Sequence, residues 1–102
     1  MKALVVILAF FITASSLGAD VLKGQRFYIK KLKSVCGING AEMAEKHTTS
    51  EWEDLDDRGK IADEIKKICP NVDESSLKQE YIPHYFDFFK EYSSDSGNIP
   101  SC

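Results

Sequence analysis

The side chains best suited to chemistry in this 102-residue chain are three cysteines and two histidines. The cysteines, Cys36, Cys69 and Cys102, can form one disulfide bond and leave one thiol over. His47 precedes Glu51 by four residues, so the two could chelate a metal ion from one helix face only if a helix ran through Thr48, where we expect a cap, and a structural zinc ion needs four ligands. No serine, cysteine or carboxylate pair has a partner at a spacing typical of hydrolysis or nucleophilic catalysis. We therefore expect no catalytic residues, no metal site and a protein that is not an enzyme.

The first nineteen residues have the layout of a secretory signal peptide. Lys2 is followed by an uncharged apolar run over residues 3–13 and then by small residues up to Ala19. This run is too short for a membrane-spanning helix, which needs roughly 20 apolar residues. We predict cleavage between Ala19 and Asp20, so that residues 1–19 are removed and residues 20–102 form one domain, periplasmic or secreted.

Export determines how the cysteines behave, because disulfide bonds persist outside the reducing cytoplasm. Three cysteines allow three pairings. We favour Cys69–Cys102, because a bridge there would pin a C-terminal tail rich in Ser, Gly and Pro, and closing this loop would contribute about 3–4 kcal/mol. The pairing leaves Cys36 as a free thiol that could be reactive at a helix end. The alternative is that all three cysteines are buried as small apolar side chains.

Apolar residues recur three and four positions apart along most of residues 20–102, which predicts helices and not strands. The first helix is expected over residues 22–35, with Gly37 as its C-terminal stop. Asn39 and Thr48 each precede a glutamate by three residues, the pattern of a capping box at a helix start. These signals predict a short helix after Asn39 and a longer one after Thr48.

Glycine and proline delimit the remaining helices. Gly59 should separate the helix after Thr48 from the next one, over residues 60–69, and Pro70 should end that helix. Asp73 could cap the last helical stretch, which Pro83 should kink or split in two. We expect a small all-α single domain of four or five short helices, packed as a compact helical bundle.

Aromatic residues are concentrated near the C-terminus. A chain this short buries only about 60–65% of its unfolded surface, so large side chains are needed to fill its core. We expect the cluster to be core and not a ligand-binding box; it comprises Tyr81, Tyr85, Phe86, Phe88, Phe89 and Tyr92.

The segment over residues 24–40 carries a family resemblance. It reads Gly24-xxx-Tyr28-xxx-Leu32-xx-Val35-Cys36-Gly37-xx-Gly40. This resembles the N-terminal segment of small class I c-type cytochromes, in which a glycine and an aromatic precede Cys-x-x-Cys-His and Gly-x-x-Gly follows. Residues 46–52 resemble the capped helix after the haem loop in some small periplasmic cytochromes. Residues 94–102 resemble the ending of small exported cytochrome c-like proteins of epsilon-type proteobacteria. The resemblance covers about half of residues 20–102 and implies a cytochrome c-like fold.

The residues that attach haem in that family are missing here. The two haem-attaching cysteines fall on Leu32 and Val35, and the proximal histidine falls on Cys36. Thioether attachment needs both thiols and axial ligation needs the imidazole, so no covalent haem is expected. We predict that Leu32 and Val35 are buried against Trp52 or the C-terminal aromatics and plug a vestigial haem site. The alternative is that both are ordinary helix residues and the resemblance is accidental.

Non-covalent haem is the alternative cofactor. His84, among aromatic residues, could supply one axial ligand, with Met43 or His47 opposite. A histidine on an aromatic helix more often fills space and bonds one neighbour, so our expectation is that no cofactor is bound.

The acidic balance, a formal net charge of −3, argues against nucleic acid and against anionic membrane surfaces. After signal cleavage we expect no membrane association. The sequence predicts an exported non-enzymatic cytochrome c-like accessory or binding protein without covalent haem, associated with an unidentified protein partner of the periplasmic redox systems or the envelope. The alternatives are an electron carrier with non-covalent haem and a thiol redox sensor that uses Cys36.

Overall fold

Helices account for the regular structure between residues 21 and 100, the part of the chain that this computed structural model describes. Within this range there is no β-strand, as the periodicity predicts. The predicted signal peptide over residues 1–19 and the predicted disulfide partner Cys102 lie outside the described residues. In chain order the elements are a helical segment over residues 21–27, the π-helix η2 (Tyr28–Leu32), α2 (Lys33–Cys36), α3 (Gly40–Ala44), α4 (Thr49–Asp57), α5 (Ile61–Ile68), the 3-10 helix η3 (Glu74–Leu77) and α6 (Ile82–Glu91).

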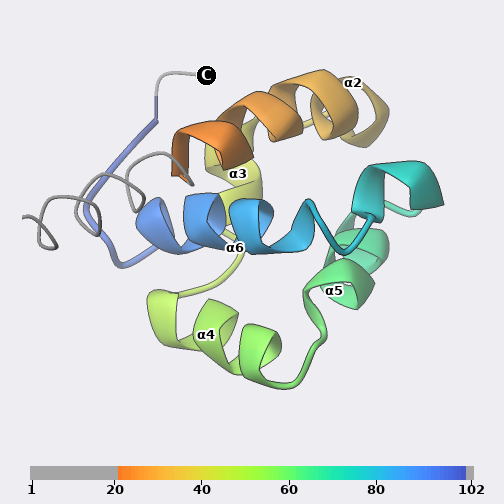
Figure 1. Ribbon diagram of the computed structural model, residues 1–102. Helices are drawn as coiled ribbons and strands as arrows, with labels where there is room; N and C mark the ends of the chain where they lie inside the picture. The colour runs from red at the N-terminus through yellow and green to blue at the C-terminus, as the bar shows by residue number, and fades with distance from the viewer. Residues whose placement is uncertain (1–20, 101–102) are drawn as a thin grey trace, which may run out of the picture.

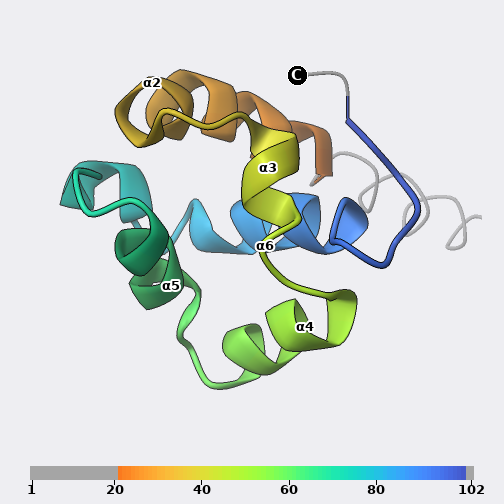
Figure 2. The same ribbon diagram turned by 180° about the vertical axis from the view of Figure 1, so that it is seen from behind.

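Residues 21–36 form one continuous helical stretch, called the first helix below. Figures 1 and 2 show α6 running through the middle of the domain, with the first helix on one side and α4 on the other. The helix α6 contacts α3, α4 and α5, and α5 also contacts α4. The elements therefore form one small all-helical domain organised around α6, which confirms the expected fold class.

Both predicted capping boxes are present. At the start of α3 the Glu42 backbone N–H donates to Asn39 Oδ1 at 2.9 Å, and the Asn39 N–H faces Glu42 Oε1 at 3.5 Å. At the start of α4 the Glu51 N–H donates to Thr48 Oγ1 at 3.2 Å, and the Thr48 N–H donates to Glu51 Oε1 at 3.0 Å. Each box satisfies two backbone donors that a helix start would otherwise leave unpaired.

The predicted helix stops are also present. Gly37 and Gly59 adopt left-handed backbone conformations, with φ of +74° and +67°, which residues with a Cβ rarely adopt. Pro83 lies in the first turn of α6, where its missing N–H is not needed, and so the last stretch is split into η3 and α6. Asp73 stands before η3, but its side chain does not cap that helix.

Gly24 allows the first helix to lie directly against α6. A Cβ at this position would be 2.0 Å from the carbonyl oxygen of His84 and 2.8 Å from Cβ of Phe88. The first helix and α6 are therefore in contact through backbone at this point, and only glycine fits between them.

The aromatic side chains form most of the core, as predicted. Tyr85, Phe88 and Phe89 of α6 are fully buried, whereas Tyr81, Phe86 and Tyr92 are half-buried against them. Trp52 of α4 stacks on Phe89, with ring centroids 4.7 Å apart. The other fully buried large side chains are Tyr28, Leu32, Met43, Ile61 and Ile65.

The polar heads of the buried aromatics are satisfied by backbone carbonyls. Tyr28 donates to Ile38 O, and Tyr85 donates to Ser76 O, each at 2.8 Å. Burial raises the pKa of the Tyr85 hydroxyl, because the phenolate would be desolvated there. The Trp52 indole N–H donates to the carbonyl of Ala44 at 2.8 Å. These bonds pair the polar group of each buried aromatic with a backbone carbonyl of η3, of α3 or of the loop before α3, so none of these groups is buried without a partner.

Candidate functional site

The three positions that the sequence resemblance equates with haem attachment have three different environments. Leu32 is fully buried in the core, as predicted. Val35 is 43% exposed, so the prediction that it plugs a pocket is wrong. Cys36 is half-buried and bonded to Cys69. Of these three residues, only Leu32 is fully buried, as a residue that fills a vestigial haem site would have to be.

The π-helix η2 explains why Val35 faces solvent. The inward stripe of the first helix is Gly24, Tyr28, Leu32 and Cys36, spaced by four residues. An α-helix turns about 100° per residue, so a spacing of four overshoots by about 40° at each step. In η2 the Lys33 N–H bonds Tyr28 O, five residues back, and this longer turn absorbs the accumulated drift. The stripe stays on the core side, and Val35 is rotated out of it.

The disulfide bond joins Cys36 and Cys69, whose Cα atoms are 5.1 Å apart. The predicted pairing of Cys69 with Cys102 is therefore wrong, and so is the prediction of a free Cys36 thiol. The reason is non-local: the first helix ends at Cys36 and α5 ends just before Cys69, and the fold brings these two C-terminal ends together. A redox sensor that depends on a free Cys36 is excluded in this state.

The C-terminal segment is held to α4 by hydrogen bonds, which the sequence analysis missed. Asp95 Oδ1 accepts from the Thr49 backbone N–H at 2.9 Å and from the Thr49 hydroxyl at 3.0 Å. These bonds hold the pKa of the Asp95 carboxyl below its ordinary value. The Ser94 N–H donates to the His47 carbonyl at 3.0 Å, and Ser93 Oγ lies 2.6 Å from Thr49 Oγ1. The order that we expected from a disulfide to Cys102 is supplied in this segment by hydrogen bonds.

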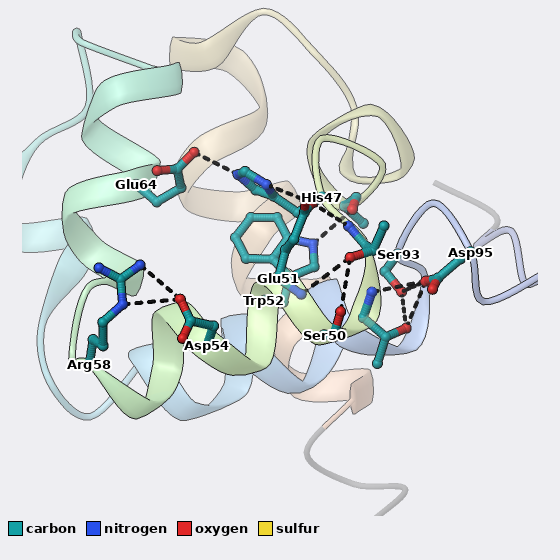
Figure 3. A network of polar contacts seen from close by, with 12 residues as sticks. His47, Ser50, Glu51, Trp52, Asp54, Arg58, Glu64, Ser93 and Asp95 are labelled. Carbon is teal, nitrogen blue, oxygen red and sulfur yellow. Dashed lines mark hydrogen bonds and ion pairs between the residues drawn. The ribbon is translucent and has the colours of Figure 1, made fainter.

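His47 lies in a network of polar contacts around the start of α4 (Figure 3). Its Nε2 lies 2.7 Å from Glu64 Oε2, its Nδ1 lies 3.3 Å from Glu51 Oε1, and its ring meets the Trp52 ring edge-on at 4.8 Å. Glu51 has a lowered pKa, chiefly because it accepts the Thr48 backbone N–H and also because it faces His47. The imidazole thus bridges the start of α4 to α5, which is a structural role.

The residues considered for haem or metal ligation are engaged elsewhere. Met43 is fully buried in the core, and both ring nitrogens of His47 face carboxylates. The His84 ring meets Phe27 edge-on at 5.6 Å, within the aromatic contact between the first helix and α6. Among residues 21–100 no group of three or more His, Cys, Asp or Glu could hold a metal ion. His47 and His84 therefore make other contacts, and Met43 is part of the core.

The solvent side of the first helix carries a surface that the sequence analysis did not single out. We call it the basic face; its members are Lys23, Arg26, Ile29, Lys30 and Lys33. The signal was visible in the sequence, because residues 21–36 contain five basic residues and no acidic one. No helix in the described part of the chain is long and apolar enough to cross a bilayer.

Comparison with known protein families, curated proteins and solved structures finds no match to this chain.

Proposed function

We propose that this chain is an exported, non-enzymatic binding or accessory protein that keeps the frame of a small c-type cytochrome without covalent haem and docks on a periplasmic redox or envelope partner. One observation carries the proposal: each haem-attachment position has another role. Leu32 fills the core, Val35 faces solvent and Cys36 forms a disulfide bond.

The frame residues that surround these positions all have structural roles. Gly24 permits the close approach to α6, Tyr28 bonds the Ile38 carbonyl, and Gly37 makes the left-handed turn that ends the first helix. Gly40 is buried at the start of α3. A frame retained for packing, with its chemical positions replaced, is what loss of the cofactor from a cytochrome would produce.

The disulfide bond supplies a covalent cross-link of the kind that an attached haem would supply. A haem held by two thioethers cross-links its attachment segment to a group in the core. Here Cys36, at the position of the proximal histidine, links the end of the first helix to the end of α5. The bridge constrains the unfolded chain by about 3–4 kcal/mol, in a domain whose total stability is expected to be about 5–15 kcal/mol.

The absorption spectrum of the protein purified from an oxidising compartment tests the loss of haem. We expect no Soret band, and we expect added haemin to keep the spectrum of free haemin. A stoichiometric Soret shift that disappears in His84→Ala or Met43→Leu would overturn the proposal in favour of a non-covalent haem carrier. A shift that persists in both variants but disappears in His47→Ala would overturn it in the same way.

Export is tested separately by the mass of the protein recovered from the periplasm and the culture medium. We expect an N-terminus at Asp20. Recovery of the intact chain from the cytoplasm alone would refute export, and with it a partner in the envelope.

A further inference from the structure

The first helix concentrates positive charge in an acidic protein. Residues 21–36 hold five basic side chains and no acid, whereas the whole chain has a formal net charge of −3. Four of the five are exposed, and the fifth, Lys31, lies over the Tyr81 ring at 4.6 Å. By contrast α4 has five acids in nine residues. The two helices lie on opposite sides of α6, so the charge is separated across the domain (Figures 1 and 2).

The charges of the basic face are not neutralised within the described part of the chain. Among residues 21–100, the ion pairs of basic side chains involve Arg58, Lys60 and Lys66, each with a nearby acid, besides the two contacts of His47. None of these pairs includes Lys23, Arg26, Lys30 or Lys33. The positive field of the first helix is therefore directed at solvent, where it can attract an acidic partner.

The basic face is also apolar at its centre and hollowed. A surface hollow of about 400 Å³ is lined by Lys23, Arg26, Phe27, Ile29 and Lys30. A second hollow of about 330 Å³, which shares Ile29, runs on past Lys33 to Ile38 and Asn39. Ile29 is 42% exposed, and Leu22 on the same helix is 54% exposed. Exposed aliphatic groups rimmed by charges of one sign are typical of a docking site.

We propose that the basic face docks an acidic protein surface that presents an apolar side chain to the hollow beside Ile29. Charge complementarity selects an acidic partner. The concave shape favours a protruding side chain over a flat bilayer. Tyr28 and Leu32 face the core, and the aliphatic side chains left on the solvent side, Leu22, Ile29 and Val35, are each only partly exposed. They lie among basic residues and form a narrower apolar surface than the broad face with which amphipathic helices enter membranes.

This inference rests on the proposed binding function and specifies its surface. The haemin and export experiments above do not involve the basic face. A failure of docking would therefore leave the haem-free exported protein intact as a proposal, and a Soret shift would leave the docking result standing.

Amide chemical-shift mapping of the full exported domain at low salt tests the proposal. The probe is a synthetic peptide with the sequence of residues 48–58, which combines five acids with a tryptophan and a leucine. A second peptide with Gln and Asn in place of the acids is its control. We expect shifts confined to residues 22–38, weaker at high salt, and absent with the neutral peptide.

Matched variants locate the contact. The pair K23E and K30E should weaken peptide binding by about tenfold or more, because attraction becomes repulsion. The pair K67E and K78E, at exposed lysines elsewhere, should leave it unchanged. Ile29→Asp should also weaken binding, whereas Ile99→Asp, at a side chain that is 79% exposed, should not.

Three outcomes would overturn the proposal. The first is no shift at low salt, or shifts that map outside the first helix. The second is binding of phosphatidylglycerol-containing vesicles or of a single-stranded DNA oligonucleotide through these lysines without peptide binding. The third is concentration-dependent self-association that K23E and K30E abolish, which would make the occupant a second copy of this chain.

Discussion

The close contact at Gly24 gives the sharpest test of the fold, because local and tertiary reasoning predict opposite signs. Gly24→Ala places a Cβ 2.0 Å from the His84 carbonyl oxygen and 2.8 Å from Cβ of Phe88. Both are atoms that cannot rotate out of the way. Since real Cβ contacts essentially never fall below 3.0 Å, the first helix and α6 must move apart.

Two opposing terms set the size of the effect. Alanine is favoured over glycine in a helix by about 0.5–1 kcal/mol. Overpacking in a close contact costs typically about 1–3 kcal/mol and occasionally more. Separation of the helices also loosens the packing of Tyr28 on Phe88, whose ring centroids are 6.1 Å apart. We expect a net destabilisation of about 1–2 kcal/mol, which for a domain of this size lowers Tm by about 4–16 °C.

Thermal unfolding of the oxidised protein, followed by circular dichroism, measures this directly. Ser34→Ala is the matched control, because Ser34 is exposed on the same helix and its replacement gains helix propensity without a new contact. We expect the control to match the wild type or exceed it slightly. If Gly24→Ala is as stable as Ser34→Ala, the first helix and α6 do not meet at backbone distance and the reasoning is refuted.

Three further predictions concern the core, the bridge and the C-terminal segment. Leu32→Ala should cost about 2–5 kcal/mol in chemical denaturation, whereas Val35→Ala should change stability by less than about 0.5 kcal/mol, and equal effects would contradict the assigned faces. Reduction of the disulfide, or Cys36→Ser, should lower the free energy of unfolding by about 3–4 kcal/mol, and non-reducing peptide mapping should recover Cys36 linked to Cys69; recovery of any other pairing would contradict the fold. Acid should release the C-terminal segment from α4, in a way that depends on Asp95.

The sequence correctly predicted the features that depend on interactions between residues close together in the chain. The capping boxes at Asn39 and Thr48, the stop at Gly37 and the split at Pro83 each depend on backbone groups close by in the chain. The aromatic residues of α6 were predicted as core because a short chain must bury its largest side chains. Fold class followed from these local signals.

The errors arose where the answer depended on three-dimensional arrangement. Disulfide pairing depends on which helix ends meet, and the sequence does not show that the ends at Cys36 and Cys69 meet. The outward position of Val35 depends on the π-helix η2. The four-residue spacing from Gly24 to Cys36 was a signal for it, because side chains four residues apart move gradually around the surface of an ordinary α-helix. The charge asymmetry of the first helix was visible in the sequence, but its significance depends on the absence of ion pairs to it from other described elements.

The acid prediction distinguishes two carboxylates: Asp95, which bonds α4 from far along the chain, and Glu51, which caps the helix that contains it. The pKa of Asp95 is lowered chiefly by the Thr49 backbone N–H and then by the Thr49 hydroxyl, whereas that of Glu51 is lowered chiefly by the Thr48 N–H next to it in the chain. A carboxyl whose folded pKa is below its unfolded value stabilises the fold above the unfolded pKa, and this contribution is lost as pH falls through the folded pKa.

The Asp95 contact should therefore be intact above its ordinary pKa of 3.8 and the Glu51 contact above its ordinary pKa of 4.5, and each should weaken as the pH falls below that value through the lowered folded pKa. In an amide titration at acid pH, the Thr49 N–H should report a midpoint below the ordinary Asp value of 3.8, and Asp95→Asn should remove that transition while leaving the one at Thr48. Glu51→Gln should do the reverse. If Thr49 titrates at or above 3.8, or if Glu51→Gln removes both transitions, the C-terminal segment is not tethered to α4 through Asp95.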